Sequence, residues 1–328
     1  MIRPEAKLSA QALAPNVPKK ATRDGYGQGI VLAAERHPEI VVLSADVTES
    51  TRNLEFKKKF PERFIQVGVH EQFLAANAAG LALAGKMPFV NAYATFCPGR
   101  AWEQIRTNIC INDVNVKIMG HHTGVSVGAD GATHQATEDI ALTRVLANMT
   151  VVVPCDAVEA RKATLAVADR KGPCYVRLTR EATPVFTTDE TPFEIGKALT
   201  LREGHDVALV ACGHLVHAAL VAAEELAQEG IEAAVIDCHT VKPLDEDTVE
   251  RAARECGAIV SIEEHQVIGG LGGAIAECLA RHTPVPMEFI GVQDRYGESG
   301  SAAELLALCG LDKDAIKEAA RKAIKRKN

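Results

Sequence analysis

The sequence predicts an α/β protein made of two doubly wound domains, of which the second is the smaller. Short apolar runs suited to buried strands alternate with longer helix-favouring stretches, which is typical of a parallel sheet covered on both faces. This alternation is interrupted once, at residues 181–196, by a segment rich in proline, threonine and acidic residues. The chain has 328 residues, 47% of them hydrophobic, which is enough for two buried cores.

The first unit begins near residue 22, after an N-terminal segment without a sustained hydrophobic period. That segment is expected to lie over another surface or to remain loose. Asp24 is expected to cap a helix that runs to about Arg36. Apolar runs then predict buried strands at residues 40–45, 64–68, 89–96, 116–122, 150–154 and 174–180. Helices are predicted between them, at residues 71–84, 101–111 and 157–170.

The second unit repeats the alternation on a smaller scale. Strands are predicted at residues 206–213, 233–238, 258–264 and 286–292, with helices at residues 215–228 and 246–256. The segment between the two units is interpreted as an interdomain linker. We therefore assign the chain to an N-terminal extension, a first domain, a linker and a second domain, at residues 1–21, 22–185, 186–197 and 198–328.

Composition excludes several classes of protein. The formal net charge is −7 and only 4% of residues are aromatic, which argues against a nucleic-acid partner and against an anionic membrane surface. The start of the chain lacks the apolar core of a signal peptide, and no apolar run approaches the ~20 residues that span a bilayer. The nine cysteines fall singly, which is typical of reduced, buried thiols. A cytoplasmic location is expected.

A glycine-punctuated loop after the predicted strand at 116–122 has the highest density of chemically useful side chains. The segment GHHTGVSVGADGATHQATED (120–139) contains His121, His122, Asp130 and His134. Glycine allows positive φ and close backbone approach, while histidine transfers protons or recognises hydroxyl groups near neutral pH. The alternatives are a plain surface loop and a zinc site, although the spacing matches neither HExxH nor a compact Cys/His cluster.

Two further segments invite a functional interpretation. Glu71 follows the strand FIQVG and opens an apolar helix, where a carboxylate can serve chemistry or simply complement the helix dipole. The glycine-rich IGGLGGA (268–274) suggests a dinucleotide fingerprint, but Ile275 holds the position of the third glycine. A tight strand-to-helix turn is the better explanation there.

Several segments, in order, resemble one enzyme family. GVHEQ, YATFCPGRAWEQIR and VGADGATHQATEDIALTRVLANMTVVVPCDAVEA are similar to the pyrimidine-binding half of transketolases. The similarity includes ATRDGYGQGI, LSADVTES and YVRLTRE, and it extends into a C-terminal domain beginning near DVALVACG. The chain most resembles the C-terminal subunit of two-chain transketolases. This implies a parallel-sheet pyrimidine-binding domain followed by a smaller, mixed-sheet transketolase C-terminal domain.

The resemblance implies thiamine diphosphate as the cofactor, bound between two chains. Glu71 matches the glutamate that hydrogen-bonds the aminopyrimidine ring nitrogen, and a shared carboxyl proton there serves catalysis. Phe96 matches the aromatic residue that stacks on the pyrimidine, and Asp46 matches a carboxylate on the cofactor-facing side. Gly99 falls near a position that often carries a second aromatic ring.

The resemblance also implies a sugar-phosphate site. Its expected members hold the phosphate or neighbouring hydroxyls, a task for which arginine is well suited: Arg23, Ser50, His122 and Arg180. Asp130 matches the residue that contacts a substrate hydroxyl. His134 matches a catalytic histidine that contacts the two-carbon unit of the donor. The implied reaction is reversible transfer of a two-carbon ketol unit from a ketose phosphate to an aldose phosphate.

The chain departs from a whole transketolase in one respect. It has no GDG motif of the kind that holds the diphosphate and its metal ion in that family. The resemblance therefore implies no metal ligand on this chain and an N-terminal partner subunit that holds Mg²⁺ or Ca²⁺. It also implies pairing of two copies of this chain within an α2β2 assembly.

Three alternatives remain open at the level of sequence. A 1-deoxy-D-xylulose-5-phosphate synthase has a similar GADG-x-THQ loop but normally no histidine at the position of His122. The beta subunit of a 2-oxoacid dehydrogenase has a similar length, but its corresponding loop differs from ADGATHQ. A non-catalytic α/β assembly subunit would have no need of Glu71 at the start of its helix.

Overall fold

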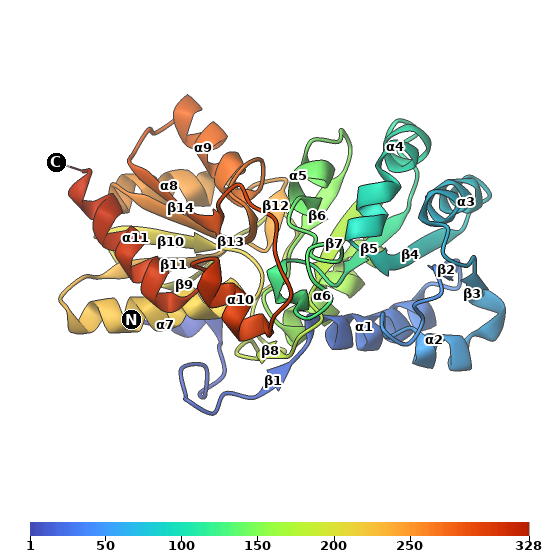
Figure 1. The fold of residues 1–328 in the computed structure, drawn as a ribbon, viewed down its shortest axis with the longest axis horizontal. Coiled ribbons are helices and arrows are strands. Elements are labelled where there is room, and N and C mark those ends of the chain that lie inside the picture. Colours follow the sequence, from blue (N-terminus) through green and yellow to red (C-terminus); the bar gives the residue numbers. More distant parts are fainter. Residues whose placement is uncertain (328) are drawn as a thin grey trace.

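The computed structural model describes residues 1–327 and confirms the predicted α/β fold (Figure 1). Two sheets, each covered by helices, lie next to each other along the long axis of the molecule. The half made mainly of residues 22–185 lies to the right in Figure 1, and the half made mainly of residues 198–327 lies to the left. No described helix has the length and apolar character needed to cross a membrane.

The first sheet has seven strands in the order β12-β6-β7-β5-β4-β2-β3. All except β12 run parallel to one another. The parallel strands are β2 (Ile40–Ser44), β3 (Phe64–Gln66), β4 (Met87–Tyr93), β5 (Lys117–His121), β6 (Thr150–Val152) and β7 (Cys174–Leu178). Their carboxyl ends therefore meet at one edge, which is where ligands bind in open α/β sheets.

Helices cover both faces of this sheet. On one face α1 (Thr22–Arg36) packs against α6 (Ala157–Asp169), and α2 (Leu54–Lys59) lies beside α1. Glycine is required at this contact, because a Cβ at Gly25 would lie 1.9 Å from the carbonyl oxygen of Ala157. The other face is covered by α3 (Glu71–Leu83), α4 (Trp102–Gln104) with its flanking turns, and α5 (Asp139–Arg144).

The second sheet has five strands in the order β14-β13-β10-β11-β9. These are β14 (Met287–Val292), β13 (Ile259–Gln266), β10 (Val207–Ala211), β11 (Ala233–Asp237) and β9 (Leu199–Arg202). The sheet is mixed, because β9 runs antiparallel to β11. Its faces are covered by α7 (Leu215–Gln228) with α11 (Lys313–Lys325), and by α8 (Glu246–Cys256) with α9 (Leu271–Arg281). α10 (Ala302–Leu308) lies next to the loop that follows β5.

The two halves exchange segments. β12 (Thr240–Lys242) leaves the second half and pairs antiparallel with β6 at the edge of the first sheet. In the other direction, Ile2 bridges Arg202 of β9, and Ala6 and Ala12 are buried in the second core. The chain then returns through β1 (Lys19–Lys20), which pairs with β8 (Thr183–Pro184). The N-terminal segment thus lies over another surface, which was one of the two expectations for it.

Two local predictions were wrong, and a third was confirmed with a change in helix type. Asp24 does not cap α1: Ala21 is the N-cap residue, and the Asp24 carboxylate instead accepts from Arg52 Nε at 2.5 Å. The strand predicted to reach Phe96 ends at Tyr93, after which the chain turns into wide helical turns. The helical stretch predicted at residues 101–111 is confirmed, although it is α-helical only over α4 and continues in π-type turns, as the bond from Ile111 N to Arg106 O illustrates.

The segment predicted as the linker is packed along its first part. The carboxylate of Asp156 accepts the backbone N–H groups of Phe186 and Thr187 at 2.9 and 2.8 Å, and Phe186 is fully buried. The predicted turn at IGGLGGA is confirmed, since Gly270 is the N-cap residue of α9. All nine cysteines are free, and all except Cys309 are buried.

Candidate active site

The side chains singled out from the sequence gather along the carboxyl edge of the first sheet. All except Arg23, which lies in the first turn of α1, follow a strand: Asp46 and Ser50 after β2, Glu71 after β3, Phe96 after β4, His122, Asp130 and His134 after β5, and Arg180 after β7. These strands are neighbours in the sheet. The edge therefore brings together residues that are far apart in the sequence.

Glu71 is a buried carboxylate at the first position of α3. Its Oε2 accepts from Arg100 Nη1 at 2.8 Å, and Arg100 is 51% exposed. The same guanidinium lies over the face of the Phe96 ring, 4.8 Å from its centroid. Glu71 and Phe96 therefore converge on one planar group that carries N–H donors.

Aromatic rings connect Phe96 to the histidine loop. Tyr93 stacks on His122 with ring centroids 4.0 Å apart, and it lies 6.4 Å from Phe96. The ring of His134 meets the Phe96 ring edge-on at 5.3 Å. The loop after β5 and the turn after β4 thus form one continuous aromatic surface at the sheet edge.

Arg23 and His122 form the other side of the site. Arg23 Nη1 donates to the backbone carbonyl oxygen of Ser50 and lies 2.9 Å from His122 Nε2. Burial, followed by the positive charges of Arg23 and Arg180, lowers the pKa of His122 to about 3. His122 is therefore neutral at pH 7, and its Nε2 accepts from Arg23, because a guanidinium can only donate.

This arrangement leaves donors without partners. With Nε2 accepting, the proton of His122 sits on Nδ1, and that atom is buried without a hydrogen-bond partner. Arg23 Nε is likewise buried and unpartnered. Unsatisfied buried donors are costly, so these two N–H groups suit a ligand that supplies acceptor oxygens.

The remaining predicted residues are placed less centrally. Arg180 Nη1 donates to the Asp130 carboxylate at 3.0 Å and to the Val127 carbonyl oxygen at 2.8 Å. Asp46 is exposed and exchanges hydrogen bonds with Gln66, and among the described residues no hydrogen bond or ion pair joins it to Glu71 or Phe96. Ser50 touches Arg23 through its backbone carbonyl rather than its hydroxyl group.

Two residues of this site were missed at the sequence level. Tyr93 and Arg100 flank Phe96 in the segment YATFCPGR, in which the resemblance gives roles only to Phe96 and to the position near Gly99. Tyr93 lies at the carboxyl end of β4, and that position was a usable signal. Arg100 reaches Glu71 only because of the wide turns after Phe96, which local patterns do not reveal.

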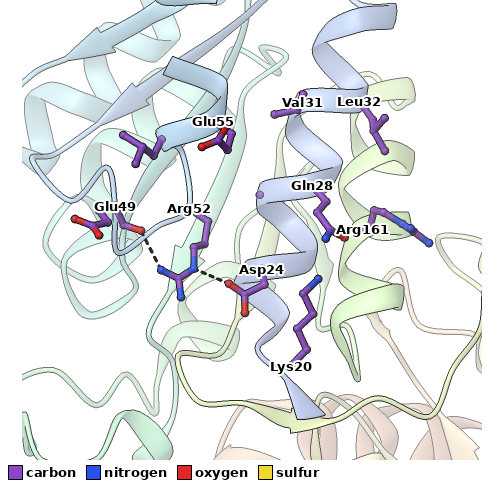
Figure 2. A pocket seen from close by; sticks show the side chains of 11 residues that line it. Lys20, Asp24, Gln28, Val31, Leu32, Glu49, Arg52, Glu55 and Arg161 are labelled. Carbon is purple, nitrogen blue, oxygen red and sulfur yellow. Dashed lines mark hydrogen bonds and ion pairs between the residues drawn. The ribbon is translucent and has the colours of Figure 1, made fainter. Parts of the chain in front are cut away.

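A cavity lies beside this site rather than within it. It has a volume of about 910 Å³ and opens between α1, α2 and α6, next to the Asp24–Arg52 ion pair (Figure 2). None of the predicted site residues lines it.

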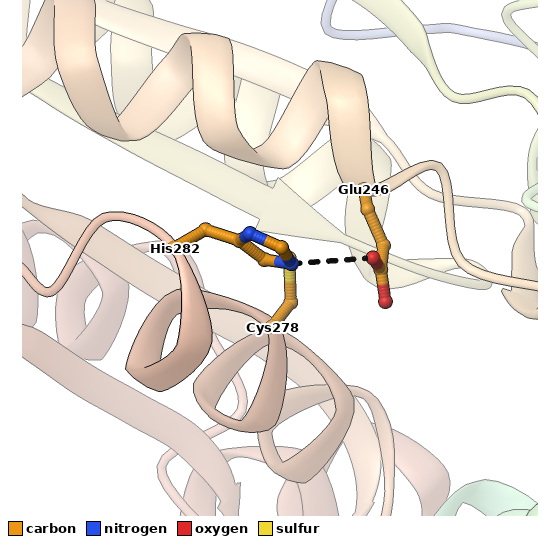
Figure 3. A group of neighbouring side chains, drawn as sticks. All are labelled: Glu246, Cys278 and His282. Carbon is orange, nitrogen blue, oxygen red and sulfur yellow. Dashed lines mark ion pairs between the residues drawn. The ribbon is translucent and has the colours of Figure 1, made fainter.

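Two groups of side chains among the described residues could in principle hold a metal ion, and neither includes a predicted site residue. Glu246, Cys278 and His282 lie together on α8 and the end of α9 (Figure 3). Glu246 is already paired there with Arg281 at 2.6 Å and lies 3.6 Å from His282. The other group, Cys155, Glu159 and Asp237, is fully buried, and burial raises the pKa of Asp237.

Comparison with known proteins decides the family. Residues 18–185 match the family described as "Transketolase, pyrimidine binding domain", and residues 196–316 match "Transketolase, C-terminal domain". The chain belongs to the transketolase family. A putative transketolase C-terminal section from Methanocaldococcus jannaschii is 41% identical over 90% of this chain and 94% of its own length.

Other similar proteins indicate that this chain is of the split type, in which the enzyme is divided between two polypeptides. The 6-deoxy-6-sulfo-D-fructose transketolase subunit SqwH of a Clostridium species is 40% identical over 93% of this chain and 95% of its own length. A solved split-gene transketolase, an inactive beta4 tetramer, superposes with a TM-score of 0.88 at 44% identity, covering 94% of this chain and 99% of that one. The transketolase of Campylobacter jejuni shares the fold, with 21% identity, a TM-score of 0.78 and 49% of that chain covered.

This chain is thus a subunit of the split type, with thiamine diphosphate as the family's cofactor and an N-terminal partner subunit implied. The residues present fit the pyrimidine part of that cofactor. The Arg100 guanidinium hydrogen-bonds to Glu71 and lies over the Phe96 ring, so the two residues flank one position where a flat group can contact both. Arg100 is half exposed, but the Glu71 carboxylate that it pairs with is only 3% exposed, so a group that takes the place of Arg100 must itself hydrogen-bond to Glu71.

Proposed function

We propose that this chain, with an N-terminal partner subunit, catalyses reversible transfer of a two-carbon ketol unit from a ketose phosphate to an aldose phosphate. One observation carries the proposal. A buried carboxylate, an aromatic surface and an arginine–histidine pair with free donors converge on one edge of the first sheet. The first two suit the pyrimidine, and the third suits a phosphorylated sugar.

Glu71 and Phe96 are proposed to hold the cofactor from this side. Thiamine diphosphate, when bound, supplies the electron sink that carbon–carbon bond cleavage requires. Glu71 would hold a proton at its carboxyl oxygen toward the ring nitrogen, and burial at the start of α3 keeps water from competing for that proton. Phe96 would orient the ring by stacking. Asp46 is proposed to face the cofactor from the end of β2.

The substrate side is proposed to use the opposite part of the edge. Arg23 Nε and His122 Nδ1 would donate to phosphate or hydroxyl oxygens, with Arg180 and Ser50 completing that pocket. Asp130 would accept from a substrate hydroxyl, and His134 would contact the two-carbon unit of the donor. The names of two relatives refer to sulfofructose and apulose 4-phosphate, which supports a family whose members differ in sugar.

The partner subunit is proposed to hold Mg²⁺ or Ca²⁺ with the diphosphate, since this chain has no GDG motif. Two copies of this chain are proposed to pair within an α2β2 assembly. The inactive beta4 form of the similar split-gene protein supports dependence on the partner.

A reconstitution assay tests this proposal. Purified chain is mixed with the N-terminal subunit, thiamine diphosphate and Mg²⁺, and transfer from xylulose 5-phosphate to an aldose phosphate is followed. Turnover is expected only when all components are present. Turnover of pyruvate but not of the ketose phosphate would favour the synthase or oxoacid dehydrogenase alternatives. Tight cofactor binding by this chain alone would contradict the role given to the partner.

Arg23→Met is expected to raise KM for the phosphorylated donor by about tenfold or more. Methionine keeps much of the side-chain volume but removes charge-assisted hydrogen bonds to phosphate. Steady-state kinetics of the reconstituted enzyme measure the change. Arg36→Met, at the other end of the same helix, is the matched control and is expected to leave KM unchanged. Equal kinetics for the two variants would refute a phosphate-binding role for Arg23.

The partner is proposed to dock on the outer side of α3. Phe73 and Leu83 on the helix are 53 and 72% exposed there, and Val69, 62% exposed, lies in the bend just before the helix begins. Gly80 lies between them, and a Cβ at Gly80 would meet nothing within 4 Å. An apolar stripe with a small residue in its middle suits close packing against another chain, and the same helix begins with Glu71.

Phe73→Glu is expected to prevent assembly with the N-terminal subunit while leaving this chain folded. A charge in the centre of an apolar interface is not compensated, whereas on the free chain it faces water. Analytical ultracentrifugation of the mixture measures assembly, and circular dichroism checks the fold. Leu308→Glu on α10, which is 52% exposed, is the control. Assembly equal to that of the parent chain would place the interface elsewhere.

A further inference from the structure

The loop between β5 and α5 rests on the second half of the chain. This loop, residues 122–137, carries His122, Asp130 and His134. Its base is closed by a bridge between Thr123 and Ala136 and by a bond from Gly124 N to Ala136 O at 2.7 Å. Directly against this base lies the end of β13, where Gln266 N donates to Thr137 O at 2.8 Å.

Glu264 of β13 makes the central contact with the loop. Its Oε1 accepts from the backbone N–H of Ser126 at 2.6 Å, and its Oε2 accepts from His214 Nε2 at 2.8 Å. Burial alone would raise the pKa of Glu264, but His214, Arg177 and the Ser126 N–H outweigh it and hold the pKa below its usual value. Gly124 leaves room for the Glu264 carboxylate, since a Cβ at Gly124 would lie 2.2 Å from the Glu264 carboxyl carbon.

A second contact holds the outer part of the loop. Gln135 Nε2 donates to the backbone carbonyl oxygen of Glu298 at 2.9 Å. A Cβ at Gly131 would lie 2.7 Å from Ser299 Oγ, so the two segments touch without space for a larger side chain. The loop is therefore held at its base by a buried carboxylate and farther out by residues 297–300.

We propose that Glu264, supported by His214, is a positioning residue that fixes the 122–137 loop and thereby orients Asp130 and His134 toward the sugar. The link is local and specific, because a carboxylate that accepts a backbone N–H fixes the course of the chain at Ser126. This link gives the second domain a role in positioning the active-site loop, whereas the sequence indicated no site in that domain. Its kinetic consequence rests on the proposed function, whereas its effect on the loop does not.

The neighbouring carboxylate is a matched control. Glu263 is equally buried on the same strand, but it faces the opposite side and accepts from Leu271 N and Gly272 N at 2.7 and 2.8 Å. Hydrogen–deuterium exchange on the full chain should become faster at residues 123–137 in Glu264→Gln. Glu263→Gln should instead change exchange around the start of α9. Should Glu264→Gln fail to fold, His214→Ala is expected to loosen the same loop to a smaller extent.

Kinetics of the reconstituted enzyme give the second measurement. Glu264→Gln is expected to raise KM for the ketose phosphate by about tenfold, with a smaller change in kcat, and Glu263→Gln is expected to leave KM unchanged. Unchanged exchange at residues 123–137, or the same KM for both variants, would overturn the positioning role. Faster exchange at that loop without ketol transfer by the parent enzyme would overturn the proposed function and leave the structural link standing.

Discussion

Glu71→Gln is expected to lower ketol transfer by about 10²–10⁴-fold in the reconstituted enzyme, which is the range for loss of a proton-transferring group. Glutamine has the same shape as glutamate and still offers an oxygen to Arg100, but it has no carboxyl proton to share with the cofactor. The defect should therefore appear mainly in kcat. The thermal stability of the chain should change little, because the buried site keeps its packing.

The control is Glu103→Gln, an exposed carboxylate on α4 in the same recognised segment. It is expected to retain the activity of the parent enzyme. Assembly with the partner should be measured for both variants, so that a loss of activity is not mistaken for a loss of association. If Glu71→Gln kept nearly the activity of the parent enzyme, the proposed proton-sharing role of Glu71 would be refuted. The alternative of a non-catalytic assembly subunit would then be favoured.

Arg177→Met is expected to cost about 3–5 kcal/mol of the free energy of unfolding, the range for breaking a buried ion pair by removing one partner. Arg177 Nε donates to Asp139 Oδ2 at 2.8 Å, and the two side chains are only 4 and 1% exposed. Burial disfavours the charged form of Arg177, but the negative charges of Asp139 and Glu264 outweigh burial and raise the pKa of Arg177 above its ordinary value. Without the guanidinium, Asp139 keeps the hydroxyl of Tyr175 as its one side-chain partner among the described residues.

Chemical denaturation measures this loss of stability. Arg281→Met is the matched control, because Arg281 pairs with Glu246 on the surface, where both side chains are exposed, and such pairs contribute less than about 1 kcal/mol. Equal losses for the two variants would show that the buried pair contributes no more than a surface pair. Asp139→Asn combined with Arg177→Met should be less harmful than Arg177→Met alone, since no buried charge then remains unpaired.

Much of the fold could be predicted from periodicity. Every predicted strand of the first half appears, because buried parallel strands are short apolar runs with clear ends. The gathering of Glu71, Phe96 and His122 at one edge also follows from strand order, since each comes soon after a strand. β12 could not be predicted, because three residues at a sheet edge carry little pattern and their partner β6 lies about 90 residues earlier.

Which residues form the site was easier to predict than which side chains they contact. Arg100 reaches Glu71 through a turn of irregular geometry, and no local rule fixes where such a turn directs a long side chain. Glu263 and Glu264 illustrate the same limit. Alternation along a strand predicts that they face opposite sides, but which side meets the histidine loop depends on how the two halves pack.

The exchange of segments between the two halves restricts where this polypeptide could be divided. A break at residues 186–197 would separate β6 from β12 and leave an unpaired strand edge, which favours aggregation. The break would also separate the second half from Ile2, which bridges Arg202, and from Ala6 and Ala12, which are buried in the core of the second half. The halves are therefore expected to unfold in one transition, and a gene split within this chain would yield two fragments that need each other to fold.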